Sequence, residues 1–185
     1  MKILIASDIH GSNHYTKKLV KIIEEINPDE IILLGDIYYH GPRNKLPKGY
    51  NPMKVAENLN KYSKKIKCVK GNCDAEVDQM ISNFQFVPSI EMNIADNKIL
   101  FIHGQNLNLE KLPKEFNFIF AGHTHVSEIK KIGEITYINP GSLSIPKMGT
   151  KHSYAILEET SISIFELNGN IVDRINFATK ESITK

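Results

Sequence analysis

The chain has 185 residues, of which 41% are hydrophobic and 24% are charged. These proportions are typical of folded globular domains and exclude disordered, collagen-like and low-complexity chains. We expect one domain, residues 1–185, with a frayed tail at 178–185. Lys and Arg number 23 against 21 Asp and Glu, and the two signs alternate along the chain. No basic face that would bind nucleic acid through its charge is predicted, so nucleic acid is considered only as a class of substrate.

The two cysteines, Cys68 and Cys73, have no second pair of cysteines to complete a known pattern. Neither a disulfide framework nor a cysteine zinc site is predicted, which favours the reducing cytoplasm. The first apolar run, residues 3–6, is too short for a signal peptide or for a membrane helix of about 20 residues. We therefore expect no membrane association.

The first half of the chain alternates apolar runs with helical periodicity. Residues 3–6 and 31–34 are uninterrupted apolar runs, typical of strands that are buried on both faces. Between them the spacing predicts a helix that begins after Ser12 and ends before Asn27-Pro28. The further elements predicted are a helix at 53–62, a strand at 66–69 and a short helix at 74–81. This alternation predicts an α/β fold.

The second half is predicted to be rich in strands. Residues 90–94 and 98–102 indicate a hairpin with its turn at Asp96-Asn97. Asn168-Gly169 is a stronger hairpin signal, because both residues tolerate the positive φ of tight turns. The other predicted strands are residues 118–121, 135–138, 154–157, 161–167 and 171–177. The longest irregular stretch, residues 39–51, is a candidate functional loop.

Five apolar runs end in residue types that bind metals. These strand ends are Asp8-Ile9-His10, Gly35-Asp36, Gly71-Asn72, His103-Gly104 and Gly122-His123-Thr124-His125. Ligands of open α/β sheets bind beyond the carboxyl ends of the strands, so we expect these residues to converge. Two carboxylates, one amide and four imidazoles exceed the needs of one ion, whereas two divalent ions that share a bridging carboxylate use them all. Because a metal-bridging hydroxide can attack phosphorus, the predicted reaction is phosphoester hydrolysis.

Each of these motifs also has a purely structural interpretation. Asp and His after a strand often cap helices, and Gly-Asp or Gly-Asn marks turns. The metal site is favoured because such ligands recur at five strand ends and because His123-Thr124-His125 places two imidazoles in one loop.

The order of the five motifs resembles that of the calcineurin-like metallophosphoesterase superfamily. Segments 40–44, 71–80 and 139–147 extend the resemblance, toward its bacterial phosphodiesterases, along nearly the whole chain. The resemblance implies a two-layered mixed β-sandwich flanked by helices, of the αββα type, and a small phosphodiester substrate. It also implies two divalent ions, with Mn²⁺ as the working metal and Zn²⁺, Fe²⁺ or Ni²⁺ compatible with the same ligands. A homo-oligomer is compatible with this family.

The resemblance also divides the ligands between the two ions. It implies that Asp8, His10 and His125 hold the first ion. The second ion is implied to be held by Asn72, His103 and His123, with Asp36 as the bridge.

One position departs from the superfamily pattern. A histidine commonly follows the asparagine, where it is assigned to the leaving group, and this chain has Cys73. A thiol is a poorer general acid near neutral pH, so we predict weaker activation of the leaving group, with Asn72 stabilising the developing charge. Cys73 itself is either an inert residue that shapes the pocket or a thiolate nucleophile, and the inert residue is favoured because the predicted reaction needs no nucleophilic cysteine.

Residues near these motifs are candidates for supporting roles. His40 and Arg43 lie in the irregular loop, and both are predicted to bind the substrate, because a guanidinium can hold two phosphate oxygens. Solvent-exposed loop residues are the alternative. Asp74 is predicted either to orient a metal ligand or to cap the helix after it. The segment 139–142, Asn-Pro-Gly-Ser, predicts a turn, which only the resemblance places beside the metals.

Two other functions stay open at this stage. Hydrolysis of phosphomonoesters or phosphoproteins needs the same metals, although the chain lacks long insertions that would build a groove for a protein substrate. The second is a non-catalytic scaffold like the retromer subunit of the superfamily, against which the complete ligand set argues.

Overall fold

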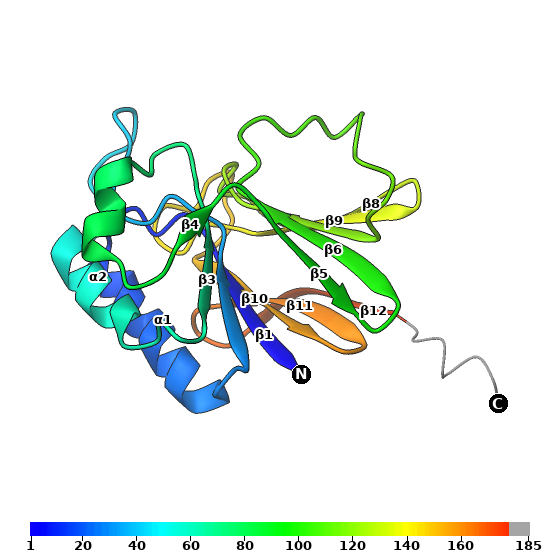
Figure 1. The fold of residues 1–185 in the computed structure, drawn as a ribbon, viewed down its shortest axis with the longest axis horizontal. Helices are drawn as coiled ribbons and strands as arrows, with labels where there is room; N and C mark the ends of the chain where they lie inside the picture. Colours follow the sequence, from blue (N-terminus) through cyan, green and yellow to red (C-terminus); the bar gives the residue numbers. More distant parts are fainter. Residues whose placement is uncertain (178–185) are drawn as a thin grey trace.

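Two mixed β-sheets are stacked face to face in the computed structural model, which describes residues 1–177 (Figure 1). The predicted tail at 178–185 lies outside the described residues. The sheets have seven and five strands. The predicted two-layered sandwich is therefore confirmed.

The strands of the seven-stranded sheet are β1 (Lys2–Ala6), β2 (Glu30–Leu33), β3 (Ile66–Val69), β4 (Phe86–Val87), β10 (Ser153–Glu158), β11 (Ser161–Glu166) and β12 (Ile171–Asn176). The strands of the five-stranded sheet are β5 (Ile90–Ile94), β6 (Asn97–Ile102), β7 (Phe118–Ala121), β8 (Ser127–Ile132) and β9 (Ile135–Pro140). The helices are α1 (Asn13–Ile26), α2 (Pro52–Asn60) and the 3-10 helix η1 (Glu76–Ile81). In space the strands follow the orders β12-β11-β10-β1-β2-β3-β4 and β5-β6-β7-β9-β8.

Strand β1 shows how the apolar layers are divided. Its side chains point alternately to the two faces of the sheet, with Leu4 and Ala6 in the cluster under α1 and α2. Ile3 and Ile5 belong to the cluster between the two sheets. The uninterrupted apolar run predicted from the sequence is thus buried on both faces.

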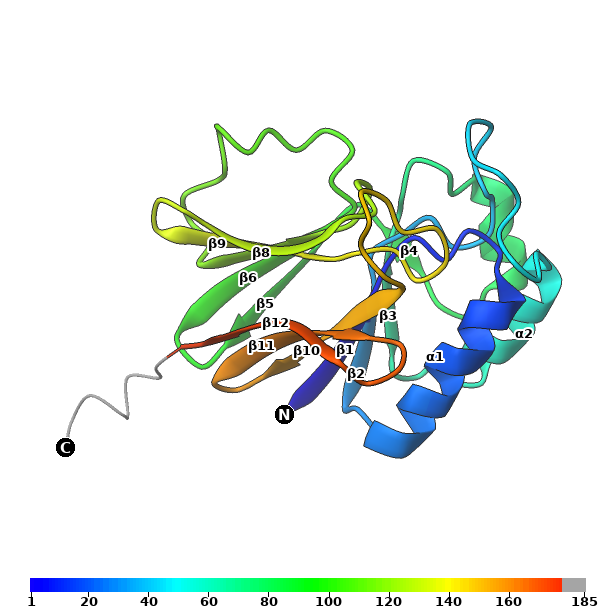
Figure 2. The same cartoon turned by 180° about the vertical axis from the view of Figure 1, so that it is seen from behind.

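The two outer faces of the sandwich are covered differently. Both α-helices of the described residues lie against the seven-stranded sheet, whereas the loop 103–117 covers the five-stranded sheet (Figure 2). Phe116 and Leu112 of this loop pack with Ile119 of the sheet in a third apolar cluster. The predicted flanking helices are therefore confirmed on one side, and irregular backbone takes their place on the other.

Helix α1 begins and ends at the residues that the sequence predicts. Ser12 is the N-cap and its Oγ accepts a hydrogen bond from the Tyr15 amide. Asn27 ends the helix with φ at 42°, in the left-handed region. The buried face consists of Thr16, Leu19, Ile22 and Ile23. No helix within residues 1–177 is long and apolar enough to cross a membrane.

Three details differ from the sequence-based prediction. The short helix expected at 74–81 is the 3-10 helix η1, which begins two residues later. Strands β4 and β8 are not predicted, because β4 has two residues and β8 carries the exposed Lys130 and Lys131. The β5–β6 turn is Ala95-Asp96, since Asn97 already pairs with Ile94.

Parallel pairing brings the polar strand ends together. Strands β1, β2 and β3 are parallel neighbours in one sheet, and β6 and β7 are parallel neighbours in the other. The segment that follows each of these strands carries predicted metal ligands. The ligands therefore collect at one end of the sandwich, where the loops of both sheets meet.

Candidate metal centre

Backbone hydrogen bonds connect the loops that carry the predicted ligands. The His10 amide donates to the Asp36 carbonyl at 2.9 Å, which joins the loops after β1 and β2. The Gly122 amide donates to the His103 carbonyl at 2.9 Å, which joins the loops after β6 and β7. The His123 amide donates to Asp8 Oδ2 at 3.1 Å and so connects the two sheets. The site is a single framework built from both sheets.

Five of the seven predicted ligands have a left-handed backbone. The φ angles are 55° at Asp8, 48° at His10, 56° at Asp36, 65° at His123 and 62° at His125. Residues other than glycine adopt such angles rarely, and they concentrate at functional sites because the surrounding structure must hold them. The backbone of this site is therefore arranged to aim side chains rather than to continue regular structure.

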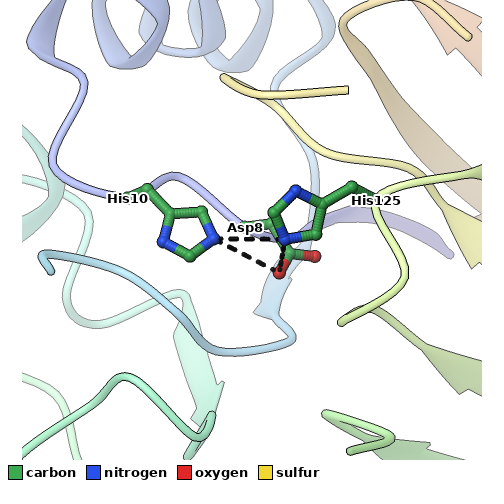
Figure 3. A group of neighbouring side chains, drawn as sticks. All are labelled: Asp8, His10 and His125. Carbon is green, nitrogen blue, oxygen red and sulfur yellow. Dashed lines mark hydrogen bonds and ion pairs between the residues drawn. The ribbon is translucent and has the colours of Figure 1, made fainter. Parts of the chain in front are cut away.

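The first group of converging side chains is Asp8, His10 and His125 (Figure 3). The Nε2 atoms of His10 and His125 are 3.3 Å apart. Asp8 Oδ1 is 3.7 Å from His10 Nε2 and 3.2 Å from His125 Nε2. Ligand atoms about 2.1 Å from a tetrahedral ion lie roughly 3.4 Å from one another. The three atoms thus have the spacing of ligands around a common ion, and all three residues are buried.

The rings are held by hydrogen bonds on the nitrogen that faces away from the site. His10 Nδ1 lies 2.7 Å from the Tyr39 carbonyl, His125 Nδ1 2.8 Å from the Ile145 carbonyl and His103 Nδ1 2.7 Å from the Leu34 carbonyl. A carbonyl oxygen only accepts, so each Nδ1 carries the hydrogen. Each Nε2 therefore points into the site, where the neutral ring could bind a metal through it, as in histidine ligands of metals.

When the rings are neutral, the ligand atoms of this group, Asp8 Oδ1 and the Nε2 atoms of His10 and His125, are all acceptors. Asp8 Oδ1 is buried and accepts no hydrogen bond from any residue in 1–177. Burial by itself raises the pKa of Asp8, but His10 and His125 lower it below its ordinary value, so the carboxylate is charged. Acceptors that are buried together and unpaired are costly unless a cation lies among them. This donor set fits a divalent metal ion.

Asp36 connects the first group to a second one. Its Oδ2 is 3.6 Å from His10 Nε2 and 3.4 Å from His103 Nε2, and His103 Nε2 is 3.0 Å from Asn72 Oδ1. Burial by itself lowers the pKa of His103, but Asp36 and Asp8 raise it to about 9. In the metal-free chain a proton thus takes the place that a cation would fill. Asp36 lies where a bridging carboxylate would lie.

His123, in the loop after β7, packs against His103 of the second group. Its ring centroid is 5.2 Å from that of His103, with the two planes nearly perpendicular. Partial burial and the neighbouring His103 lower the pKa of His123, which keeps its imidazole neutral and able to bind a metal.

Asp74 holds the backbone that carries Asp36. Its Oδ2 accepts hydrogen bonds from the Asp36 and Gly71 amides, both at 2.7 Å, and its Oδ1 accepts one from the Ile37 amide at 2.8 Å. Burial raises the pKa of Asp74 to about 6, although these amides favour the charged form. The N-cap of η1 is Ala75. Of the two predicted roles, orienting the ligand loops is the one that the contacts show.

The segment 139–142 lies beside the predicted ligands. Asn139 Nδ2 donates to the Gly122 carbonyl at 2.8 Å and to Thr124 Oγ1 at 2.9 Å, which holds the loop between the two histidines. Ser142 Oγ donates to the Asp8 carbonyl at 2.8 Å. The prediction of a turn is wrong, because Asn139 and Pro140 pair with β8 as the last residues of β9. The side chains of the segment nevertheless link the loops after β1 and β7.

Close approach explains why glycines precede some ligands. A Cβ atom at Gly71 would collide with the Asp36 carboxylate, and one at Gly122 would collide with Ser7 Oγ. Only a hydrogen atom fits at these two positions.

A cavity of about 550 Å³ opens over the two groups. It is lined by the predicted ligands His10, Asp36, Asn72, His123 and His125, by Cys73, by residues 41–44 and by Lys147. Among these described lining residues, the charged side chains that are not predicted ligands are Arg43 and Lys147. Lys147 has no role in the sequence-based prediction. Lys147 does not directly follow a predicted strand. The only sequence feature that could have identified it is its place in the segment 139–147, which carries part of the family resemblance.

His40 lies beside this cavity and is absent from the described residues that line it. Its Nδ1 is 3.2 Å from the Asn44 carbonyl, and its ring packs edge-on against Tyr50. These contacts place His40 in the turn that carries Arg43, and its contact with the substrate stays a prediction.

The environment of Cys73 favours the protonated thiol. Partial burial and the negative charge of Asp36 raise the pKa of Cys73 to about 12. Asn72 Nδ2 donates to Cys73 Sγ at 3.3 Å. These contacts favour an inert side chain over a thiolate nucleophile.

Comparison with known proteins reveals close relatives. Residues 1–161 match the family model described as the calcineurin-like phosphoesterase superfamily domain. Phosphodiesterase YfcE of Escherichia coli K12 is 41% identical over 171 residues, which cover 91% of this chain and 93% of that protein. The solved structure of the E. coli phosphoesterase Yfce covers 96% of this chain and 100% of its own, with a TM-score of 0.92 and 37% identity. A mutant of Vps29 from Entamoeba histolytica covers 96% of this chain and 100% of its own at a TM-score of 0.66, and its 18% identity shows a common fold alone.

Replacing Asp74 by Asn should destabilise the metal-free protein. An amide offers one acceptor oxygen, so at least one of the buried amides of Asp36, Ile37 and Gly71 loses its partner. We expect the free energy of unfolding, measured by urea denaturation with chelator present, to fall by about 1–3 kcal/mol. Asp29→Asn is the matched control, because the exposed Asp29 accepts a single bond from the Lys2 amide. Equal losses in the two variants would contradict the role given to Asp74.

Cys73 should react slowly with iodoacetamide in the folded, metal-free protein. With its pKa raised to about 12, little thiolate is present at pH 8, and we expect alkylation at least about tenfold slower than that of the urea-unfolded chain. Peptide mass spectrometry separates Cys73 from the buried Cys68. A folded-state rate at Cys73 equal to the unfolded one would contradict this environment.

Proposed function

Because this chain belongs to the calcineurin-like phosphoesterase superfamily, we propose that it is a single-domain, metal-dependent phosphodiesterase with a dinuclear site. The observation that carries the proposal is the buried group of Asp8, His10 and His125, whose possible ligand atoms lie within 4.8 Å of one another. A cation among these buried atoms offsets the cost of their burial. The relative at 41% identity is named a phosphodiesterase, which supports the substrate class.

We propose that the predicted ligands are divided between two metal ions. Asp8, His10 and His125 hold one ion, Asn72, His103 and His123 hold the other, and Asp36 bridges them. When bound, two such ions lower the pKa of a shared water and polarise the phosphoryl oxygens. The oxygen and nitrogen ligands suit Mn²⁺ and are compatible with Zn²⁺, Fe²⁺ and Ni²⁺. In this proposal Mn²⁺ is the working metal.

The remaining residues of the cavity position the substrate. Asn72 is exposed at the floor of the cavity, and its Nδ2 is available to a phosphoryl oxygen in exchange for its contact with Cys73 Sγ. Arg43 lines the cavity, and its guanidinium can hold two phosphate oxygens of the substrate. Cys73, held as a thiol, gives little help to the departing oxygen, so leaving groups of low pKa are favoured.

The two alternative functions are less well supported. A phosphomonoesterase would share the metals, but the relative at 41% identity is named for diesters. A scaffold would have no need of buried carboxylates and imidazoles that converge around Asp8 and Asp36. We expect the enzyme to act in the cytoplasm, since both described cysteines are free thiols, and a homo-oligomer stays a prediction.

Metal dependence and substrate class can be tested together. We would strip the protein with chelator, restore one metal at a time, and compare bis(p-nitrophenyl) phosphate with p-nitrophenyl phosphate. We expect turnover of the diester with Mn²⁺ and little turnover of the monoester. Asp8→Asn should abolish the diester activity, because it removes a charged ligand from the buried group. A preference for the monoester would support the phosphomonoesterase. No hydrolysis of either ester with any metal would support the scaffold.

Cys73→His should broaden the range of leaving groups. An imidazolium near the departing oxygen can donate a proton that the thiol retains. In a series of aryl and alkyl phosphodiesters, we expect a shallower dependence of log kcat/KM on leaving-group pKa for Cys73→His than for the wild type. Cys73→Ser is the matched control, because a hydroxyl is also a poor acid. Equal slopes for the wild type and Cys73→His would contradict the role given to this position.

A further inference from the structure

Two cations from different loops face the cavity over the predicted metal ligands. Arg43 comes from the loop after β2, and Lys147 from the connection between β9 and β10. Both side chains are exposed at the mouth, whereas His10 and Asp36 at the floor are buried. Of the described residues that line the cavity, Asp36 is the only acidic one, and it is a predicted ligand. The mouth is therefore positively charged without an acidic residue of its own to balance it.

The turn that displays Arg43 is closed by its own hydrogen bonds. Asn44 Nδ2 donates to the His40 carbonyl at 2.8 Å, and the Asn44 amide donates to the Gly41 carbonyl at 3.3 Å. Gly41 has φ at 77°, which this tight turn requires. The backbone beneath Arg43 is thus fixed before any ligand arrives.

The turn that displays Lys147 is attached to a predicted metal ligand. The Lys147 amide donates to the His125 carbonyl at 3.1 Å, and the Lys147 carbonyl accepts from Thr150 Oγ1 at 2.7 Å. His125 Nδ1 in turn bonds to the Ile145 carbonyl. The position of Lys147 relative to the ligands is therefore set by the hydrogen bonds that orient His125.

The charge at the mouth exceeds what a simple diester needs. In the proposed function, two divalent ions bring four positive charges and the carboxylates of Asp8 and Asp36 cancel two of them. A phosphodiester has one negative charge and the bridging hydroxide of the proposed reaction has another, so the charges at the floor of the cavity already sum to zero. Arg43 and Lys147 add two positive charges that neither the ligands nor the reacting phosphate balances. A terminal phosphate carries a charge of about −1.5 to −2 at pH 7 and would balance both.

We propose that Arg43 and Lys147 bind a second phosphate group of the substrate, so that the preferred substrates are phosphodiesters with an additional terminal phosphate. This inference rests on the proposed function. The cavity of about 550 Å³ has the volume of sites for ligands much larger than one phosphate. The guanidinium holds two oxygens of the terminal phosphate, and the ammonium contributes a compact charge from a different loop.

A matched pair of chromogenic diesters tests the proposal. Thymidine 5′-(p-nitrophenyl phosphate) and its 3′-phosphorylated counterpart share the leaving group and differ by one terminal phosphate. We expect the metal-restored wild type to have about tenfold higher kcat/KM for the doubly phosphorylated ester, because KM is lower and kcat is similar. This ratio corresponds to one charge-assisted contact at a partly exposed site. The preference should shrink as ionic strength rises, because salt screens exposed charges.

Variants and a binding measurement separate this inference from the proposed function. Lys147→Met should remove most of the preference, Lys147→Arg should retain it, and Lys151→Met is the matched control, because the exposed Lys151 lines a different cavity. By calorimetry, thymidine 3′,5′-bisphosphate should bind the wild type about tenfold more tightly than thymidine 5′-monophosphate, and Lys147→Met should abolish that difference.

An equal preference in Lys147→Met and the wild type would overturn the inference and leave the phosphodiesterase intact. If neither ester is hydrolysed with any metal, the proposed function fails, and calorimetry still decides whether the second phosphate is bound.

Discussion

Three hydrogen bonds from imidazole Nδ1 atoms to backbone carbonyls determine what this site can bind. They fix the rings of His10, His103 and His125 so that each Nε2 lone pair points inward. The carboxylates of Asp8 and Asp36 lie between them, so the interior attracts positive charge, whether a proton or a metal ion. Nearly every other feature of the site supports this arrangement. The left-handed ligand residues aim the side chains, and Asp74 and the segment 139–142 hold the loops in place.

Much of this arrangement could be predicted from the order of residues, because buried strands have a simple signature. An apolar run such as residues 3–6 predicts a strand, and the polar residue that follows it must lie at the end of that strand. Asp8, Asp36 and His103 were identifiable on this basis alone. The helix α1 was also predictable, since Ser12 and Asn27 mark its ends.

Other parts could not be predicted, for physical reasons that differ from case to case. Strand β8 is held by its pairing with β9 and exposes Lys130 and Lys131, so its sequence lacks apolar alternation. Lys147 reaches the cavity only because its turn bonds to the His125 carbonyl, a contact between loops. The left-handed conformation of Asp8 and His10 is imposed by the folded structure rather than by their residue types. Such features depend on the tertiary structure.

The assembly of the site from both sheets has a consequence for how the protein is maintained. Asp8 and Asp36 follow strands of the seven-stranded sheet. His103 follows β6 of the five-stranded sheet, and His125 lies in the loop after β7 of the same sheet. An ion coordinated by both groups acts as a reversible cross-link between the two layers, and it binds only when they are docked. Ligands that bind the native state alone stabilise it by mass action. The supply of metal would then set the lifetime of the folded chain as well as its chemistry, so that metal starvation and protein turnover become coupled.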